Sequence, residues 1–187
     1  MSALLFTAAS AWLGAAVFTA LQKPRPIMLH AAEQNRGGEL EGIILRREEA
    51  IGTVPPGARE HQRLSPGEHS EQSAIFSSFC DGYEYLSPAM ADKLEPEMLK
   101  ELMSKPKKAE GSAKLVYGFD FFYAAYYHGS EDIEPGPCRV RFEGTEQSMR
   151  AELVSLSRDA EGCAVVLRLL LCPECIDLRF CKAELEY

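Results

Sequence analysis

Residues 138–181, CRVRFEGTEQSMRAELVSLSRDAEGCAVVLRLLLCPECIDLRFC, decide the fold that the sequence predicts. Apolar side chains alternate with charged ones around Val140 and again around Leu178, which is the period-two pattern of half-buried strands. Two further extended runs lie at Gln147–Ser157 and Cys163–Leu171, and turn residues separate the last three runs. We therefore expect an antiparallel four-stranded meander with one buried face.

The residues that precede this stretch predict helices. Ser87 and Glu95 each stand before a proline, and a proline at the first helical position begins a helix well. Short helices are thus expected at Pro88–Leu94 and Pro96–Met103, after an amphipathic helix that begins near Ile75. The prediction is an α+β domain over residues 73–187, in which short helices cover the meander.

The aromatic stretch Lys114–Tyr127, KLVYGFDFFYAAYY, fits neither period cleanly. We expect a strand over Leu115–Phe119 and a helical turn over Phe121–Tyr127. Three roles stay open for its rings: core packing, a partner interface, or the wall of an apolar ligand pocket. The pocket would be like those of cystatin or nuclear-transport-factor domains, a comparison of fold plan and not of family.

The N-terminal residues Ala3–Leu21, ALLFTAASAWLGAAVFTAL, carry no charge. As a helix they would span roughly 28 Å, close to the thickness of a bilayer's hydrocarbon core. We expect residues 1–22 to form a single-pass transmembrane anchor; a cleaved signal peptide and a buried helix are the rivals. Lys23 and Arg25 follow the span, so the positive-inside rule puts the C-terminal domain on the matrix, stromal or cytoplasmic side. The mitochondrial inner membrane is the first expectation, and thylakoid or bacterial inner membranes are alternatives.

Small residues within this predicted anchor suggest a contact with another helix. Ser10 and Gly14 stand four residues apart, as do Ala11 and Ala15, and such spacing lets two helices approach closely. The expected partners are therefore other membrane-protein subunits, together with the lipid bilayer.

Between anchor and domain, residues 23–72 read as a polar linker or strap. Gly52–Gln72 is rich in proline, glycine and charge, and short helical fragments are expected around Met28–Gln34 and Ile44–Ile51. The chain of 187 residues has a formal net charge of −8, which argues against nucleic acid as a partner. Its one concentrated basic stretch is the local patch at residues 105–108.

Cys172 and Cys175 form the sharpest local motif, Cys-Pro-Glu-Cys. Two thiolates at this spacing can hold zinc from a tight turn, although a closed site needs two more ligands. Cys163 and Cys181 would lie roughly 20–30 Å from the turn along extended strands, so they cannot complete it. The remaining candidate ligands are Cys80, Cys138 and a histidine. A redox pair, a disulfide at the hairpin end, and turn thiols without chemistry are the other interpretations.

No recognisable catalytic pattern occurs: GxSxG, GxxxxGK[ST], GxGxxG and HExxH are all absent. His128 begins a loop with acidic neighbours, for which a solvated acidic loop is the expected role. We expect a non-catalytic accessory subunit of a multi-protein membrane complex, without a cofactor. The alternatives are a membrane-tethered domain that binds a lipid or apolar ligand, and a zinc or thiol-redox protein that uses Cys172 and Cys175.

Overall fold

The computed structural model describes residues 37–67, 71–105, 107–109, 111–129, 132–158, 160, 162–170 and 173–187. The described residues belong to one compact unit. Its strands are β1 (Gly37–Ile51), β2 (Arg63–Leu64), β3 (Ala74–Ser77), β4 (Ala113–Tyr127), β5 (Gly136–Phe142), β6 (Met149–Arg158), β7 (Cys163–Leu170) and β8 (Phe180–Glu186). The helices are the 3₁₀ helices η1 (Pro88–Lys93) and η2 (Pro173–Ile176) and the α-helix α2 (Pro96–Ser104).

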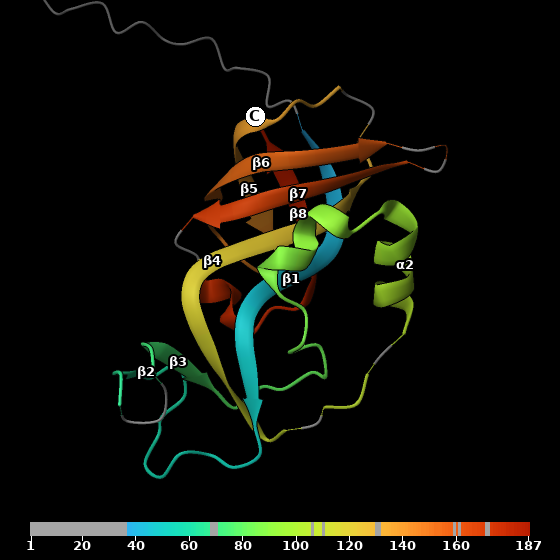
Figure 1. Ribbon diagram of the computed structural model, residues 1–187. Helices are drawn as coiled ribbons and strands as arrows, with labels where there is room; N and C mark the ends of the chain where they lie inside the picture. The colour runs from blue at the N-terminus through green and yellow to red at the C-terminus, as the bar shows by residue number, and fades with distance from the viewer. Residues whose placement is uncertain are drawn as a thin grey trace, which may run out of the picture. The chain divides into compact units, whose positions relative to one another are not determined.

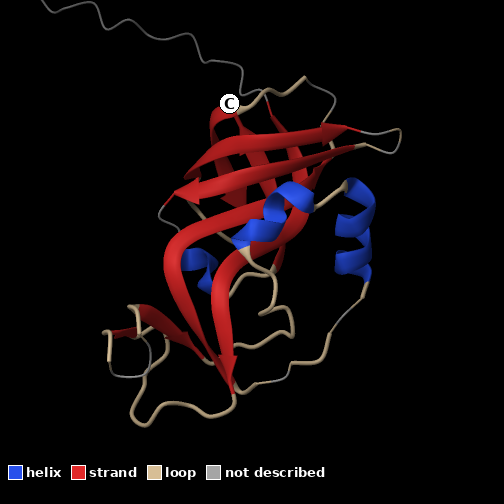
Figure 2. Ribbon diagram, viewed as in Figure 1, coloured by secondary structure: helices blue, strands red, loops and turns tan. Residues whose placement is uncertain are grey.

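Six of these strands close into an antiparallel barrel (Figures 1 and 2). Their order is β1–β8–β5–β6–β7–β4, and β4 pairs back with β1 to close the ring. Ile43 of β1 stands opposite Phe180 on one side and Ala124 on the other. The long strands β1 and β4 bend and continue beyond the barrel, where β3 and then β2 extend the sheet from β4 (Figure 1).

The barrel interior is a single apolar core supplied by alternate residues of each strand. In β5, for example, Cys138, Val140 and Phe142 are buried while the residues between them are exposed. Tyr123 of β4 meets Phe142 edge to face, with ring centroids 5.0 Å apart, and its hydroxyl donates to the carbonyl of Cys181 at 2.7 Å. The aromatic stretch therefore contributes to core packing, one of its three expected roles.

Helices cover part of the barrel's outer wall. The outward side chains Ile43 and Leu45 of β1 and Tyr126 of β4 lie in a second cluster, together with Leu86 and Leu99 from the helical segment. The helices predicted at residues 88–94 and 96–103 are confirmed as η1 and α2. Each begins with a proline in its first turn, as the sequence predicts. Because of this cover, residues 42–46 of β1 and 123–127 of β4 are buried on both faces.

The predicted α+β class is wrong: the fold is mostly β, with a closed barrel, extra strands and few helices. Residues 74–77, expected to begin a helix, form β3. The expected helical turn 121–127 lies in β4, and the expected helical fragment 44–51 lies in β1. Residues 74–77, 121–127 and 44–46 are mostly buried on two sides, which removes the alternation that identifies a strand from its sequence.

The expected four-stranded meander is right only in its first three strands. β5, β6 and β7 are consecutive neighbours, as the alternation predicts. The fourth run instead begins with η2, and the strand that follows, β8, pairs with β5 and β1 rather than with β7. Residues 37–51, within the expected linker, supply β1, which is what allows the ring to close.

The single-pass membrane architecture expected from the sequence is also wrong. Among the described residues, none of the helices combines the length and apolar content that crossing a bilayer would need. Ala3–Leu21 lies outside the described residues, as do Ser10, Ala11, Gly14 and Ala15, the residues expected to bind a partner helix. The placement in a mitochondrial, thylakoid or bacterial inner membrane rested on that anchor and is not retained.

Candidate functional site: an acidic cleft on the barrel wall

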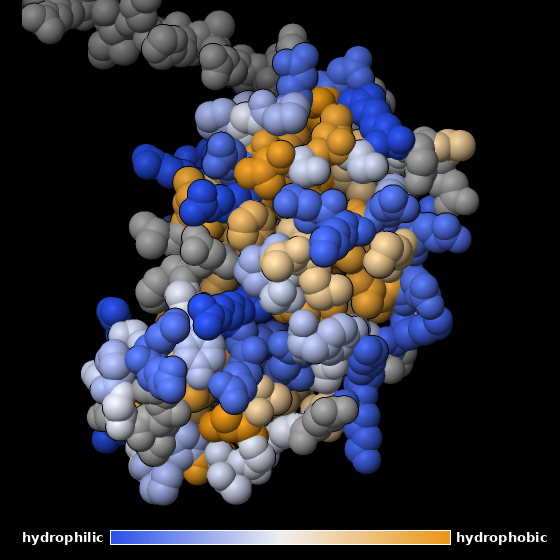
Figure 3. Space-filling model, viewed as in Figure 1, coloured by the Kyte–Doolittle hydropathy of each residue, from blue (hydrophilic) through white to orange (hydrophobic). Residues whose placement is uncertain are grey.

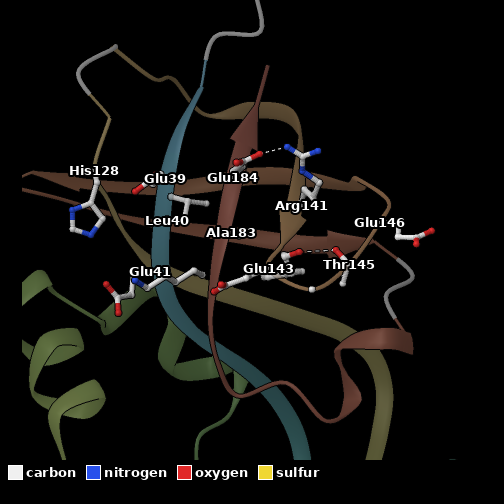
Figure 4. Close-up of a pocket in the computed structure, with 13 residues that line it drawn as sticks. Glu39, Leu40, Glu41, His128, Arg141, Glu143, Thr145, Glu146, Ala183 and Glu184 are labelled. Carbon is white, nitrogen blue, oxygen red and sulfur yellow. Dashed lines mark hydrogen bonds and ion pairs between the residues drawn. The ribbon is translucent and has the colours of Figure 1, made fainter.

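A cleft of about 870 Å³ lies on the outer wall of the barrel, over β1, β8 and β5 (Figure 4). Five carboxylates line it, from Glu39, Glu41, Glu143, Glu146 and Glu184. The cationic side chains there are those of Arg141 and Lys182, so the cleft has a surplus of three negative charges when His128 is neutral. We call these lining residues the acidic cleft.

The strand register brings like charges together in this cleft. Glu39 of β1 stands directly opposite Glu184 of β8, a cross-strand arrangement that destabilises a sheet. Arg141 of β5 stands on the other side of Glu184 and forms an ion pair with it (Figure 4). Glu41 lies opposite Lys182. The side chains of Glu39, Glu143 and Glu146 have no ion-pair partner among the described residues.

A tight turn after β5 fixes the edge of the acidic cleft. Gly144 has φ +84°, a left-handed conformation that glycine adopts without strain. The backbone N–H and the hydroxyl of Thr145 both donate to the carbonyl of Phe142, at 3.0 and 2.8 Å. The N–H of Glu143 donates to the carbonyl of Lys182 at 2.9 Å, which ties the turn to β8. The cleft is thus a preformed surface.

His128 lies at the opposite side of the acidic cleft (Figure 4). Its backbone N–H donates to the carbonyl of Glu39 at 2.9 Å, and its ring lies 5.0 Å from that of Tyr126. Of the acidic loop residues expected near it, Glu131 lies outside the described residues, and Asp132 pairs with Arg158 at 3.0 Å. The structure therefore places His128 beside glutamates of β1 that the sequence did not associate with it.

The carboxylates of the acidic cleft do not converge on one metal ion. Within the described part of the chain, the one group of ligand atoms close enough is Glu60, His61 and Asp177, whose atoms lie within 4.8 Å of one another. His61 Nε2 is 2.7 Å from Asp177, and Asp177 also accepts a hydrogen bond from the Ser77 hydroxyl at 3.0 Å. These residue types can hold a divalent cation. The three side chains are nevertheless exposed, and the hydrogen bond between His61 and Asp177 accounts for the main contact.

A second concentration of charge is buried beside η2. The side chains of Arg46, Glu48 and Lys114 are fully buried and that of Arg179 is 3% exposed. Glu48 Oε2 lies 3.1 Å from Lys114 Nζ and 3.3 Å from Arg46 Nε, and its other oxygen contacts Arg179. We call these four residues and Asp81, which accepts from Arg179 Nε at 2.8 Å, the buried ionic cluster.

The buried ionic cluster joins several elements at one end of the barrel. Arg46 donates to the carbonyls of Cys175 and Leu178, and Arg179 donates to the carbonyl of Ile44 at 2.8 Å. Burial lowers the pKa of Lys114 to about 8, and the positive charge of Arg46 acts in the same direction. The cluster connects β1, β4, the residue before β8 and the loop after β3, and it is almost entirely shielded from solvent.

The cysteines do not assemble into a shared site among the described residues. Cys175 is disulfide-bonded, and Cys172 lies outside the described residues. The free thiols are those of Cys80, Cys138, Cys163 and Cys181. Burial raises the pKa of Cys138 to about 11 and that of Cys181 to about 12, so neither forms a reactive thiolate near neutral pH. Zinc or redox chemistry at Cys172 and Cys175 stays a prediction.

Sequence reasoning missed the acidic cleft because its first wall lies in β1. The sequence predicts a linker for residues 37–51, and this prediction does not bring Glu39 and Glu41 beside β8. The alternation in β5 and β8 did predict that Arg141 points away from the core. No protein-family model, curated protein or solved structure matches this chain.

Proposed function

We propose that this protein is a non-catalytic accessory subunit that binds a basic segment of a partner protein in the acidic cleft. The observation that carries the proposal is the position of Glu39 opposite Glu184 in a cleft with surplus negative charge. Like charges that face each other on neighbouring strands lower the stability of the fold. A cationic partner would relieve this repulsion, and the relief would favour binding.

The spread of the carboxylates supports a polypeptide over a single ion. They come from β1, β8 and the turn after β5, and they do not approach within ligand distance of one common point. An extended segment that carries several lysines or arginines can reach all of them. The opposed charges would favour fast association and would make binding sensitive to salt.

Binding of fluorescein-labelled octalysine to the full chain tests the proposal. We expect saturable binding that weakens as salt rises. The variant that combines Glu39→Gln, Glu143→Gln and Glu146→Gln should bind at least about tenfold more weakly, because it removes the surplus charge.

A matched variant removes three exposed carboxylates outside the acidic cleft: Glu71→Gln, Glu95→Gln and Glu152→Gln. It has the same net charge as the cleft variant, and it should keep octalysine binding close to that of the parent protein. Equal losses in the two variants, or no saturable binding to the parent protein, would show the proposal to be wrong.

A further inference from the structure

An apolar groove lies between η1 and α2, at a different place from the acidic cleft. Met90, Leu94 and Leu102 form its base, and Tyr85 and Met98 form its rim. These two rim side chains are 51% and 45% exposed, and they line the same groove. Figure 3 shows apolar surface over η1 and α2 bordered by hydrophilic side chains. We call this feature the Tyr85 groove.

Lysines surround one end of the Tyr85 groove. Lys105 and Lys107 line it, and an adjoining hollow shares Tyr85 and Lys107 with it and adds Lys108 and one carboxylate, that of Glu84. This is the basic patch at residues 105–108, in a chain whose net charge is −8. The patch and the groove together make an apolar surface with a cationic rim.

The positive charge of this rim is only partly neutralised. Lys105 pairs with Glu101 one helical turn before it. Lys107 Nζ lies 2.7 Å from the Tyr85 hydroxyl and 4.1 Å from the centre of its ring, so its neighbour is a neutral aromatic group. Among the described residues, no carboxylate forms an ion pair with Lys107 or Lys108. Their charge is available to a ligand.

We propose that the Tyr85 groove binds an acidic segment of a partner protein, which inserts an apolar side chain beside Met98 and pairs its carboxylates with Lys107 and Lys108. The groove has a volume of about 240 Å³, which suits one or two apolar side chains. Its rim of tyrosine and methionine is typical of binding surfaces, because these side chains bury much area and adapt to their partner.

The concave shape favours a polypeptide over a lipid surface. A flat bilayer surface cannot fill a groove, whereas an amphipathic helix or a short extended segment places single side chains into one. Since the acidic cleft would take a basic segment and the Tyr85 groove an acidic one, the two surfaces recognise different partners. The second inference therefore does not rest on the first.

The test uses a fluorescein-labelled peptide in which one leucine and one phenylalanine stand four residues apart among glutamates. Anisotropy with the full chain should show saturable binding, and amide chemical-shift changes should fall on residues around Tyr85, Met98 and Lys107. Replacing the glutamates by glutamines, or the two apolar residues by serines, should each weaken binding at least about tenfold.

Variants of the protein locate the site. Met98→Ser alone, and Lys107→Gln with Lys108→Gln, should each weaken binding at least about tenfold. Val154→Ser alone, and Arg139→Gln with Arg150→Gln, make the same kinds of change at exposed positions elsewhere and should leave binding unchanged. The inference is overturned if the peptide fails to bind, if all variants bind alike, or if the chain instead binds phosphatidylserine vesicles through these residues.

Discussion

The buried ionic cluster and the acidic cleft use the same side chains, glutamate and its cationic partners, in opposite ways. In the cluster, the Glu48 carboxylate contacts three cations and is shielded from water. In the cleft, Glu184 pairs with the exposed Arg141 and faces a second carboxylate, that of Glu39. One region surrounds a buried carboxylate with cations, whereas the other leaves negative charge without a cationic partner.

This difference distinguishes buried charges, which hold strands and loops of the fold together, from exposed charges, which remain available to a partner. A buried ion that loses its counterion is strongly destabilising, because nothing replaces the lost hydration. An exposed ion is hydrated and screened, so its pair contributes little to folding and its charge can still attract a ligand. Whether a glutamate of this barrel stabilises the fold or is available to a ligand therefore depends on its burial and on its neighbouring charges.

The largest expected effect comes from Glu48→Gln. The substitution keeps the shape of the side chain but leaves Arg46, Lys114 and Arg179 without their shared carboxylate. Breaking a buried ion pair in this way costs about 3–5 kcal/mol. Urea unfolding should show this loss, while Glu152→Gln, an exposed change, should stay within about 0.5 kcal/mol of the parent protein. Similar values for the two variants would mean that the cluster does not stabilise the fold.

The next effect is the pH dependence that Lys114 adds to stability. Its pKa is lowered to about 8 from 10.5, so between these values the unfolded chain binds more protons than the folded one. Stability therefore rises with pH across this window, by at most about 1.4 kcal/mol per pH unit.

Lys114→Met removes this titration and provides the comparison. The free energy of unfolding of the parent protein, minus that of Lys114→Met, should increase between pH 8 and pH 10.5 and be flat below the window. Because both proteins keep Arg46 and Arg179, their own titration largely cancels in the difference. A difference that falls as pH rises would contradict a lysine whose charge is disfavoured by burial.

The strands and helices that could be predicted from the sequence are those with one solvent-exposed face. In β5, Val140 and Phe142 point inward between exposed neighbours, so the strand and its pairing with β6 follow from alternation. The helices after Ser87 and Glu95 follow from their prolines. In both cases a local sequence pattern is enough to predict the element, because one side of the element is exposed to solvent.

The other sequence-based predictions are wrong where tertiary contacts bury residues whose sequence pattern is typical of exposed ones. The run of charges around Arg46 and Glu48 resembles a solvated helix face, yet these side chains lie in the buried ionic cluster. Tyr123 and Tyr126 of β4 are buried on opposite faces, so no alternation is visible there. The acidic cleft was missed for the same reason: its carboxylates are distant in sequence, and only the closing of β1 onto β8 brings them together.

A smaller effect should show that the acidic cleft costs the fold stability. Glu39→Gln removes the repulsion from Glu184, so it should raise the free energy of unfolding by about 0.2–1 kcal/mol while weakening octalysine binding. Glu41→Gln should lower stability instead, because Glu41 stands opposite Lys182. Urea unfolding of the two variants checks these signs. If Glu39→Gln is destabilising, the like-charge pair is not the strained feature that we infer.

The smallest effect is expected for Arg141→Gln, which breaks the exposed ion pair with Glu184. Because both side chains are hydrated, the free energy of unfolding should not change measurably. The loss of a cation nevertheless increases the negative surplus of the acidic cleft, so octalysine should bind about two- to threefold more tightly. Arg139→Gln makes the same change on the same strand, at a residue that does not line the cleft, and should leave affinity unaltered. Equal tightening in both variants would mean that octalysine senses the net charge of the protein and not this site.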